Sequence, residues 1–165
     1  MMKISKELSK GLNNQIVAEM YSANMYQAMS IHTAMMGLDG FTHWLRLQAN
    51  EEMEHAWRII DYMISRGVKP EVGAIDAVKS DWGTPLELFE AVYAHEVEVS
   101  GMIDKLMDIA HNDKDRASQD MLWWFVHEQI EEEDTPAGIV DKLKAYGPNG
   151  LGAIDQLLYK RQDEE

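Results

Sequence analysis

The stretch Glu51-Glu52-Met53-Glu54-His55 reappears in altered form 77 residues later as Glu128-Gln129-Ile130-Glu131-Glu132. In both copies the second and fifth residues stand three positions apart, so on a helix they share one face. A glutamate precedes the second residue of each copy by 33 positions: Glu19 in the first half and Glu96 in the second. This equal spacing predicts a pair of antiparallel helices that occurs twice, with all of these positions at one height of a four-helix bundle.

The repeated side chains are types that bind metal ions. A single Glu-x-x-His is common by chance and indicates only a surface glutamate and an ordinary histidine. Repetition of inward-facing carboxylates changes this interpretation, because buried carboxylates are costly unless they are paired or metal-bound. Oxygen-rich ligation with one imidazole suits iron. We expect two irons bridged by Glu52, the first also bound by Glu19 and His55 and the second by Glu96 and Glu132.

The second copy is imperfect, because Gln129 replaces a glutamate and Glu132 replaces a histidine. Fewer charged or imidazole ligands should hold one of the irons more weakly, as suits a metal in transit. Glu128, Glu131 and Glu132 share a helix face, and Glu51 is the counterpart of Glu128 in the first copy. These four carboxylates predict a third, all-oxygen iron site. The alternative is a solvated acidic stripe.

Two aromatic residues fall near the expected centre. Tyr26 follows Glu19 by seven residues, which is two turns along the same helix face. Trp124 precedes Glu128 by four residues. Either ring is accounted for by core packing, and a redox-active tyrosine beside iron is the functional alternative.

The predicted helices follow from apolar residues at helical spacing and from glycine and proline stop signals. Four long helices and a short fifth one are expected, at Ser5–Met35, Phe41–Arg66, Thr84–His111, Asp115–Ala145 and Leu151–Lys160. The third opens with a capping box that has proline at its first position. In the fourth, Pro136 removes a hydrogen bond to the Glu132 carbonyl and predicts a kink.

The segment Val68–Gly83 decides the topology. Its 16 residues carry no helical pattern. A helix of about 26 residues is roughly 40 Å long, and 16 extended residues reach roughly 53 Å. This connection can therefore cross the whole bundle and make the second and third helices parallel. We expect an all-α four-helix bundle with one long crossover.

Composition narrows the class of protein. The 165 residues are 45% hydrophobic and 27% charged, which predicts one globular domain over residues 1–165. A net charge of −14 argues against a nucleic-acid partner and suits a protein that gathers cations. The absence of cysteine excludes disulfides, iron–sulfur clusters and cysteine-ligated zinc. Without a signal peptide or membrane-spanning run, residence in the cytoplasm is expected.

The chain resembles the non-haem bacterial and archaeal ferritins from Leu8 to about Leu158. The resemblance rests on residues 15–23, 51–56, 92–97 and 124–133, of which the last, Trp-Phe-Val-His-Glu-Gln-Ile-Glu-Glu-Glu, is highly specific. It implies a ferritin-like bundle with a ferroxidase centre that oxidises Fe(II) with O₂ or H₂O₂. It also implies that Gln129 lines the centre, that a third iron site exists, and that a hollow shell of 24 subunits stores ferric mineral. The residues implied at these sites are Glu19, Tyr26, Glu51, Glu52, His55, Glu96, Trp124, Glu128, Gln129, Glu131 and Glu132.

Three alternative classes of protein stay open on the sequence. Bacterioferritins bind haem through a methionine, and Met53 stands in the corresponding place. They also carry a second Glu-x-x-His, which here reads Gln129-Ile130-Glu131-Glu132, so no haem is expected. A rubrerythrin-like di-iron peroxidase normally has a cysteine-ligated electron-transfer domain, which this chain cannot build. The third alternative is an acidic helical bundle without catalysis, such as a scaffold or DNA-protecting protein.

Overall fold

A computed structural model describes residues 3–162 and shows an all-helical chain. Its elements are α1 (Lys6–Met35), α2 (Asp39–Ser65), α3 (Pro85–Asn112), α4 (Arg116–Tyr146), the 3₁₀ turn η1 (Pro148–Gly150) and α5 (Leu151–Leu158). Within this range there is no strand. None of the helices in the described part is both long and apolar enough to cross a membrane. The predicted fold class, with four long helices and a short fifth, is confirmed.

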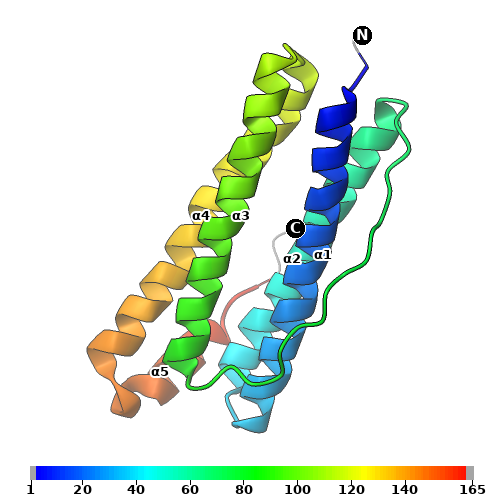
Figure 1. The fold of residues 1–165 in the computed structure, drawn as a ribbon. Helices are drawn as coiled ribbons and strands as arrows, with labels where there is room; N and C mark the ends of the chain where they lie inside the picture. Colours follow the sequence, from blue (N-terminus) through cyan, green and yellow to red (C-terminus); the bar gives the residue numbers. More distant parts are fainter. Residues whose placement is uncertain (1–2, 163–165) are drawn as a thin grey trace.

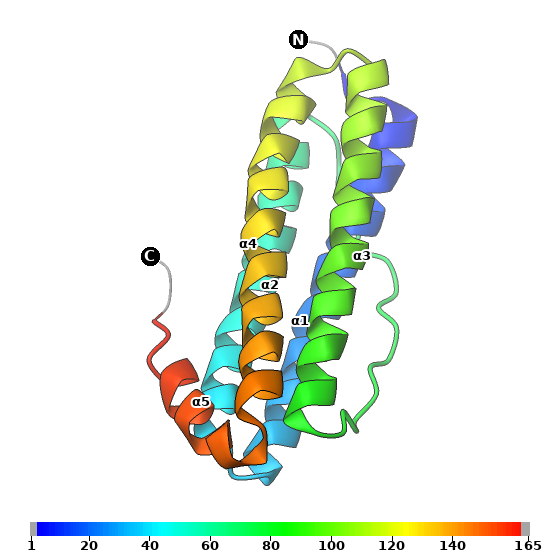
Figure 2. The same ribbon diagram turned by 90° about the vertical axis from the view of Figure 1, so that its left-hand side faces the viewer.

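The long helices form two antiparallel pairs, α1 with α2 and α3 with α4 (Figure 1). Between α2 and α3 the chain runs the whole length of the bundle without regular structure (Figure 1), so these two helices are parallel. The short helix α5 lies at the same end of the bundle as the α1–α2 turn (Figure 2), and it packs mainly against α2. The predicted crossover topology is therefore present.

The helix ends follow their local sequence in α1, α3 and α4. The Ser5 side chain accepts from the Leu8 amide at 3.1 Å at the start of α1. Thr84 and Glu87 form the predicted capping box at the start of α3. The Asp115 side chain caps α4, and Gly147, with φ of 60°, ends it.

Pro136 does not interrupt the fourth helix. The helix α4 is continuous from Arg116 to Tyr146, with the ring of Pro136 buried inside the bundle. The proline lacks the N–H that would bond to the Glu132 carbonyl, so one helical hydrogen bond is missing at this turn. The expected kink at this position stays a prediction.

The apolar core is divided into two clusters. One lies at the α5 end and contains Tyr26, Phe41, Trp44 and Phe89; the other lies at the opposite end and contains Leu8, Leu12, Ile59 and Phe125. Along every long helix, the polar residues expected at the metal site fall between these clusters. The bundle therefore holds one buried polar layer between two apolar ones.

Candidate metal centre

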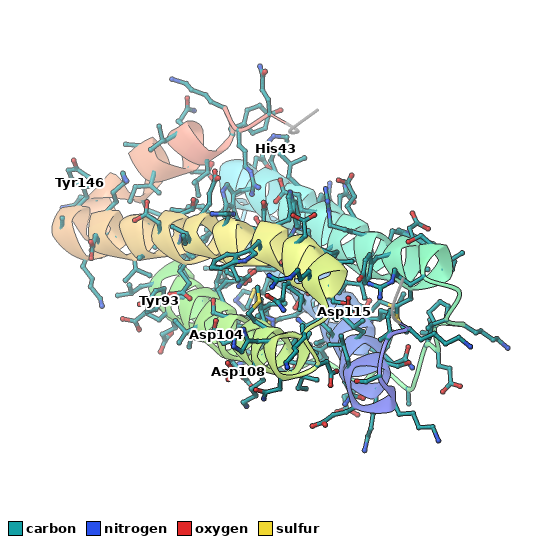
Figure 3. The ribbon with its side chains drawn as sticks, turned by 90° about the horizontal axis from the view of Figure 1, so that it is seen from above. His43, Tyr93, Asp104, Asp108, Asp115 and Tyr146 are labelled. Carbon is teal, nitrogen blue, oxygen red and sulfur yellow. The ribbon has the colours of Figure 1, made fainter. Side chains whose placement is uncertain are left out.

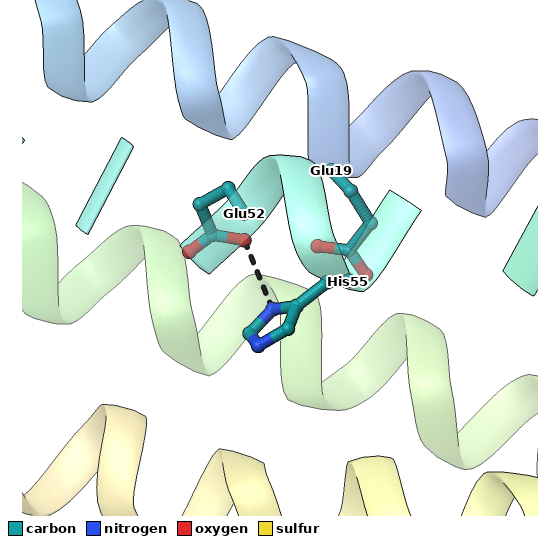
Figure 4. A group of neighbouring side chains, drawn as sticks. All are labelled: Glu19, Glu52 and His55. Carbon is teal, nitrogen blue, oxygen red and sulfur yellow. Dashed lines mark ion pairs between the residues drawn. The ribbon is translucent and has the colours of Figure 1, made fainter. Parts of the chain in front are cut away.

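The polar layer gathers the residues that the repeat predicts. Glu19 comes from α1, Glu52 and His55 from α2, and Glu96 from α3. Each is at most 5% exposed. Figure 4 shows the Glu19 and Glu52 carboxylates beside the His55 ring, whose Nδ1 lies 3.3 Å from a Glu52 oxygen. Four charged or titratable groups from three helices thus converge without exposure to solvent, an arrangement that is costly without a counter-ion.

Two groups of ligand atoms overlap at Glu52. In each group, one ligand atom per residue lies within 4.8 Å of the others: Glu19, Glu52 and His55 form the first, and Glu52, Glu96 and Glu132 the second. Because Glu52 has two carboxylate oxygens and belongs to both groups, it can bridge two cations. This is the division of ligands that the sequence predicts.

The four residues of the third expected site do not all belong to one close ligand group in the described part of the chain. A third close group joins Glu128 and Glu132 to His55, without Glu51 or Glu131. The His55 Nε2 atom lies 3.9 Å from a Glu128 oxygen, and Glu131 is exposed. The side chains of Glu51, Glu128, Glu131 and Glu132 nevertheless line one cavity of about 530 Å³ between α2, α4 and the C-terminal segment.

Three glutamine amides donate to the carboxylates of the layer. Gln15 Nε2 donates to Glu19 at 2.9 Å, and Gln129 Nε2 donates to Glu96 at 3.3 Å. Gln48 Nε2 donates to Glu132 at 2.5 Å. The sequence predicted a site-lining role for Gln129 but not for the other two. Their positions in the sequence could have indicated such a role. Gln15 and Gln48 each stand four residues before a predicted ligand, on the same helix face.

The aromatic residues contact the layer from opposite ends. The buried hydroxyl of Tyr26 donates a short hydrogen bond to Glu96, and its ring packs edge-on against Trp44. Tyr26 is therefore both a core residue and a direct neighbour of the centre. Trp124 packs edge-on against His55 at 5.4 Å between ring centroids, and the Arg58 guanidinium lies over the Trp124 ring, 3.7 Å from its centroid.

Burial determines the protonation of the layer. It raises the pKa of Glu52 well above the ordinary value, and the charges of Glu96 and Glu19 raise it further. Burial likewise raises the pKa of Glu96 to about 7, although hydrogen bonds from Tyr26 and Gln129 oppose the shift. The pKa of Glu132 is raised by burial and then by the charge of Glu52. Without a bound metal ion, the raised pKa values favour protonated carboxyls in the layer near neutral pH, and incoming cations would replace the protons.

Glu96→Gln should change how stability depends on pH. A carboxyl whose pKa rises from 4.5 to about 7 on folding binds more protons in the folded state, so the contribution of Glu96 to wild-type stability falls across that window as pH rises. The glutamine cannot titrate. Relative to wild type, the metal-free variant should therefore gain on the order of 2 kcal/mol between pH 4.5 and 8, or about 5 °C in melting temperature.

Thermal unfolding in the presence of a chelator measures this difference. Glu54→Gln, at an exposed position of helix α2, is the matched control. Its melting temperature should change with pH in the same way as that of wild type. Parallel curves for Glu96→Gln and wild type would show that Glu96 does not carry the raised pKa.

Known proteins resemble this chain over nearly its whole length. Residues 9–146 match the family model of the ferritin-like domain. A bacterial non-haem ferritin of Bacteroides fragilis is 50% identical over 158 residues, covering 96% of this chain and 99% of that protein. One from Campylobacter jejuni is 37% identical and covers 94% of each chain. The crystal structure of an open-pore ferritin from Archaeoglobus fulgidus superposes with a TM-score of 0.95 at 39% identity, over 98% of this chain and 100% of that one.

Proposed function

The chain belongs to the ferritin family, and from this premise we propose that it oxidises Fe(II) at the buried polar layer and stores the ferric product inside a shell of about 24 copies. The observation that carries the proposal is the pair of ligand groups that share Glu52. Two Fe(II) ions held there would each give one electron and become Fe(III), and with two protons from solvent these electrons reduce one O₂ to H₂O₂; peroxide is the alternative oxidant.

The residues of the chain have separate tasks in this reaction. Glu19 and His55 hold one Fe(II), Glu96 and Glu132 hold the other, and Glu52 keeps the two ions close together. The raised pKa values of Glu96 and Glu132 mean that protons leave as iron enters. Binding should therefore strengthen as pH rises through neutrality.

The neighbouring side chains orient these ligands. The three glutamine amides and the Tyr26 hydroxyl each bond to a ligand carboxylate and fix its direction before iron arrives. The apolar clusters on both sides of the layer exclude water from it. Ligands that are oriented in advance and buried away from water favour oxidation of Fe(II) at the centre over its oxidation in solution.

Aerobic loading tests the storage function. We expect that Fe(II) added in large excess over the centres stays in solution and elutes with a single protein peak in size-exclusion chromatography with light scattering. The peak should have the mass of about 24 subunits plus iron. Iron that precipitates without protein, or a monomer or dimer in both apo and loaded samples, would contradict storage.

The third site should control the fate of ferric iron after the first oxidation. Glu128 and Glu131 lie beside the centre, whereas Glu132 is shared with it. A Glu128→Ala, Glu131→Ala double variant should therefore keep the first oxidation burst within about twofold of wild type. Its Fe(II)-to-O₂ ratio should change on repeated additions of iron.

Stopped-flow absorbance and an oxygen electrode measure the two quantities. Loss of the burst itself would place Glu128 or Glu131 in the catalytic centre. Unchanged behaviour on every addition would mean that the acidic residues form only a solvated face.

A further inference from the structure

The C-terminal segment is attached to α2 at successive points. Asp155 of α5 accepts hydrogen bonds from the backbone amides of Gly40 at 2.8 Å and Phe41 at 3.0 Å. A Cβ atom at Gly40 would lie 1.7 Å from the Asp155 carbonyl oxygen, so glycine is required for this approach. Further along α2, the His43 ring bonds to the carbonyl oxygen of Arg161 at 2.7 Å, and Figure 3 shows His43 beside this segment.

This attachment places the Arg161 guanidinium on the acidic cavity. Its Nη2 donates to a Glu51 oxygen at 2.6 Å, and its Nη1 donates to the Gln48 side-chain oxygen at 2.9 Å. The group also stacks over the Trp44 ring, 4.7 Å from its centroid. The ion pair is largely shielded, because the Arg161 and Glu51 side chains are each 21% exposed. Charge-assisted bonds of this length are among the stronger ones in proteins.

Gln48 connects Arg161 to a second carboxylate, that of Glu132, through hydrogen bonds on both sides of its side-chain amide. Because its side-chain oxygen accepts from Arg161, its amide nitrogen faces inward and donates to Glu132. Arg161 is thus linked directly to Glu51 and through one amide to Glu132. Both carboxylates line the cavity where the third iron is expected.

We propose that Arg161 is a built-in cation that occupies the Glu51 side of the third site and has to move away before iron binds there. The inference rests on the proposed ferritin function and concerns what sets the affinity of the third site for iron. A guanidinium and a divalent cation compete for the same carboxylate oxygens and repel each other. Arg161 therefore keeps the third site weaker than the paired centre, so iron that reaches it leaves readily.

Equilibrium binding of Fe(II) under anaerobic conditions tests this competition. In Arg161→Gln the third Fe(II) should bind about tenfold more tightly. The affinity of the two tighter ions should change less, because Arg161 reaches their ligand Glu132 only through Gln48. Arg161→Lys keeps the positive charge but cannot repeat the forked contacts or the stacking on Trp44, so its third-site affinity should fall between those of wild type and Arg161→Gln. Lys144→Gln is the matched control, because it removes a cation from an ion pair with Glu90 at 2.8 Å outside the cavity.

The outcomes separate this inference from the function on which it rests. Unchanged or weaker third-site binding in Arg161→Gln, with two ions still bound tightly, would overturn the role of Arg161 alone. Equal tightening in Lys144→Gln would do the same, since it would show an effect of net charge. If wild type bound no Fe(II) tightly and oxidised none, the proposed function would fail, and the role of Arg161 with it.

Discussion

Replacing Glu52 with alanine is expected to lower the initial rate of Fe(II) oxidation by about a hundredfold or more, while the helical fold stays intact. Glu52 is the one residue common to the two groups proposed to hold the iron pair, so its loss would remove the proposed bridge and one proposed ligand of each iron. Its carboxyl contributes no apolar contact, and burial raises its pKa and so disfavours its charged form. The apo variant should therefore fold at least as well as wild type.

Stopped-flow absorbance at about two Fe(II) per subunit measures the effect. Glu54→Ala is the matched control, because it removes a carboxylate two residues away from an exposed position of the same helix. This control should keep the wild-type rate. A near-native rate in Glu52→Ala would show that the paired centre is not the place of oxidation.

The double variant Trp57→Glu, Ile64→Glu should prevent assembly of the proposed shell. These two residues are 54% and 58% exposed although they are large and apolar. They stand two turns apart on α2, so they share its outer face. We expect this face to contact another subunit because it exposes two large apolar side chains, and two added charges in an already acidic protein should break such a contact.

Sedimentation velocity measures the assembly. We expect the wild type to sediment as a shell of about 24 subunits and the variant as a much smaller species. The conservative pair Trp57→Phe, Ile64→Val keeps the face apolar and should assemble like wild type. An intact shell in the glutamate variant would show that this face of α2 is not a subunit interface.

The relation between sequence and structure is clearest at the polar layer. Equal separations of 33 residues from Glu19 to Glu52 and from Glu96 to Gln129 predict one height, because the turn between each pair of helices is short. The structure brings these side chains together. The length of the connection between α2 and α3 also predicted that these helices are parallel, because an extended chain of that length can span the bundle.

Contacts between distant parts of the chain were not predictable in this way. The start of α2 was predicted at Phe41, but the helix begins at Asp39, and Asp155 accepts from the amide of Gly40, 115 residues away in the chain. The Arg161–Glu51 contact likewise spans 110 residues and depends on where α5 docks. Gln15 and Gln48 resemble surface glutamines in the sequence until the fold turns them toward the carboxylates.

The polar layer is proposed to bind and oxidise iron in pairs. Titrating apo protein with Fe(II) in the presence of O₂, and recording the amplitude of the fast oxidation phase, tests it most directly. We predict an amplitude that rises linearly and levels off at about two Fe(II) per subunit. An amplitude that never levels off, with a rate equal to that of protein-free buffer, would contradict the claim.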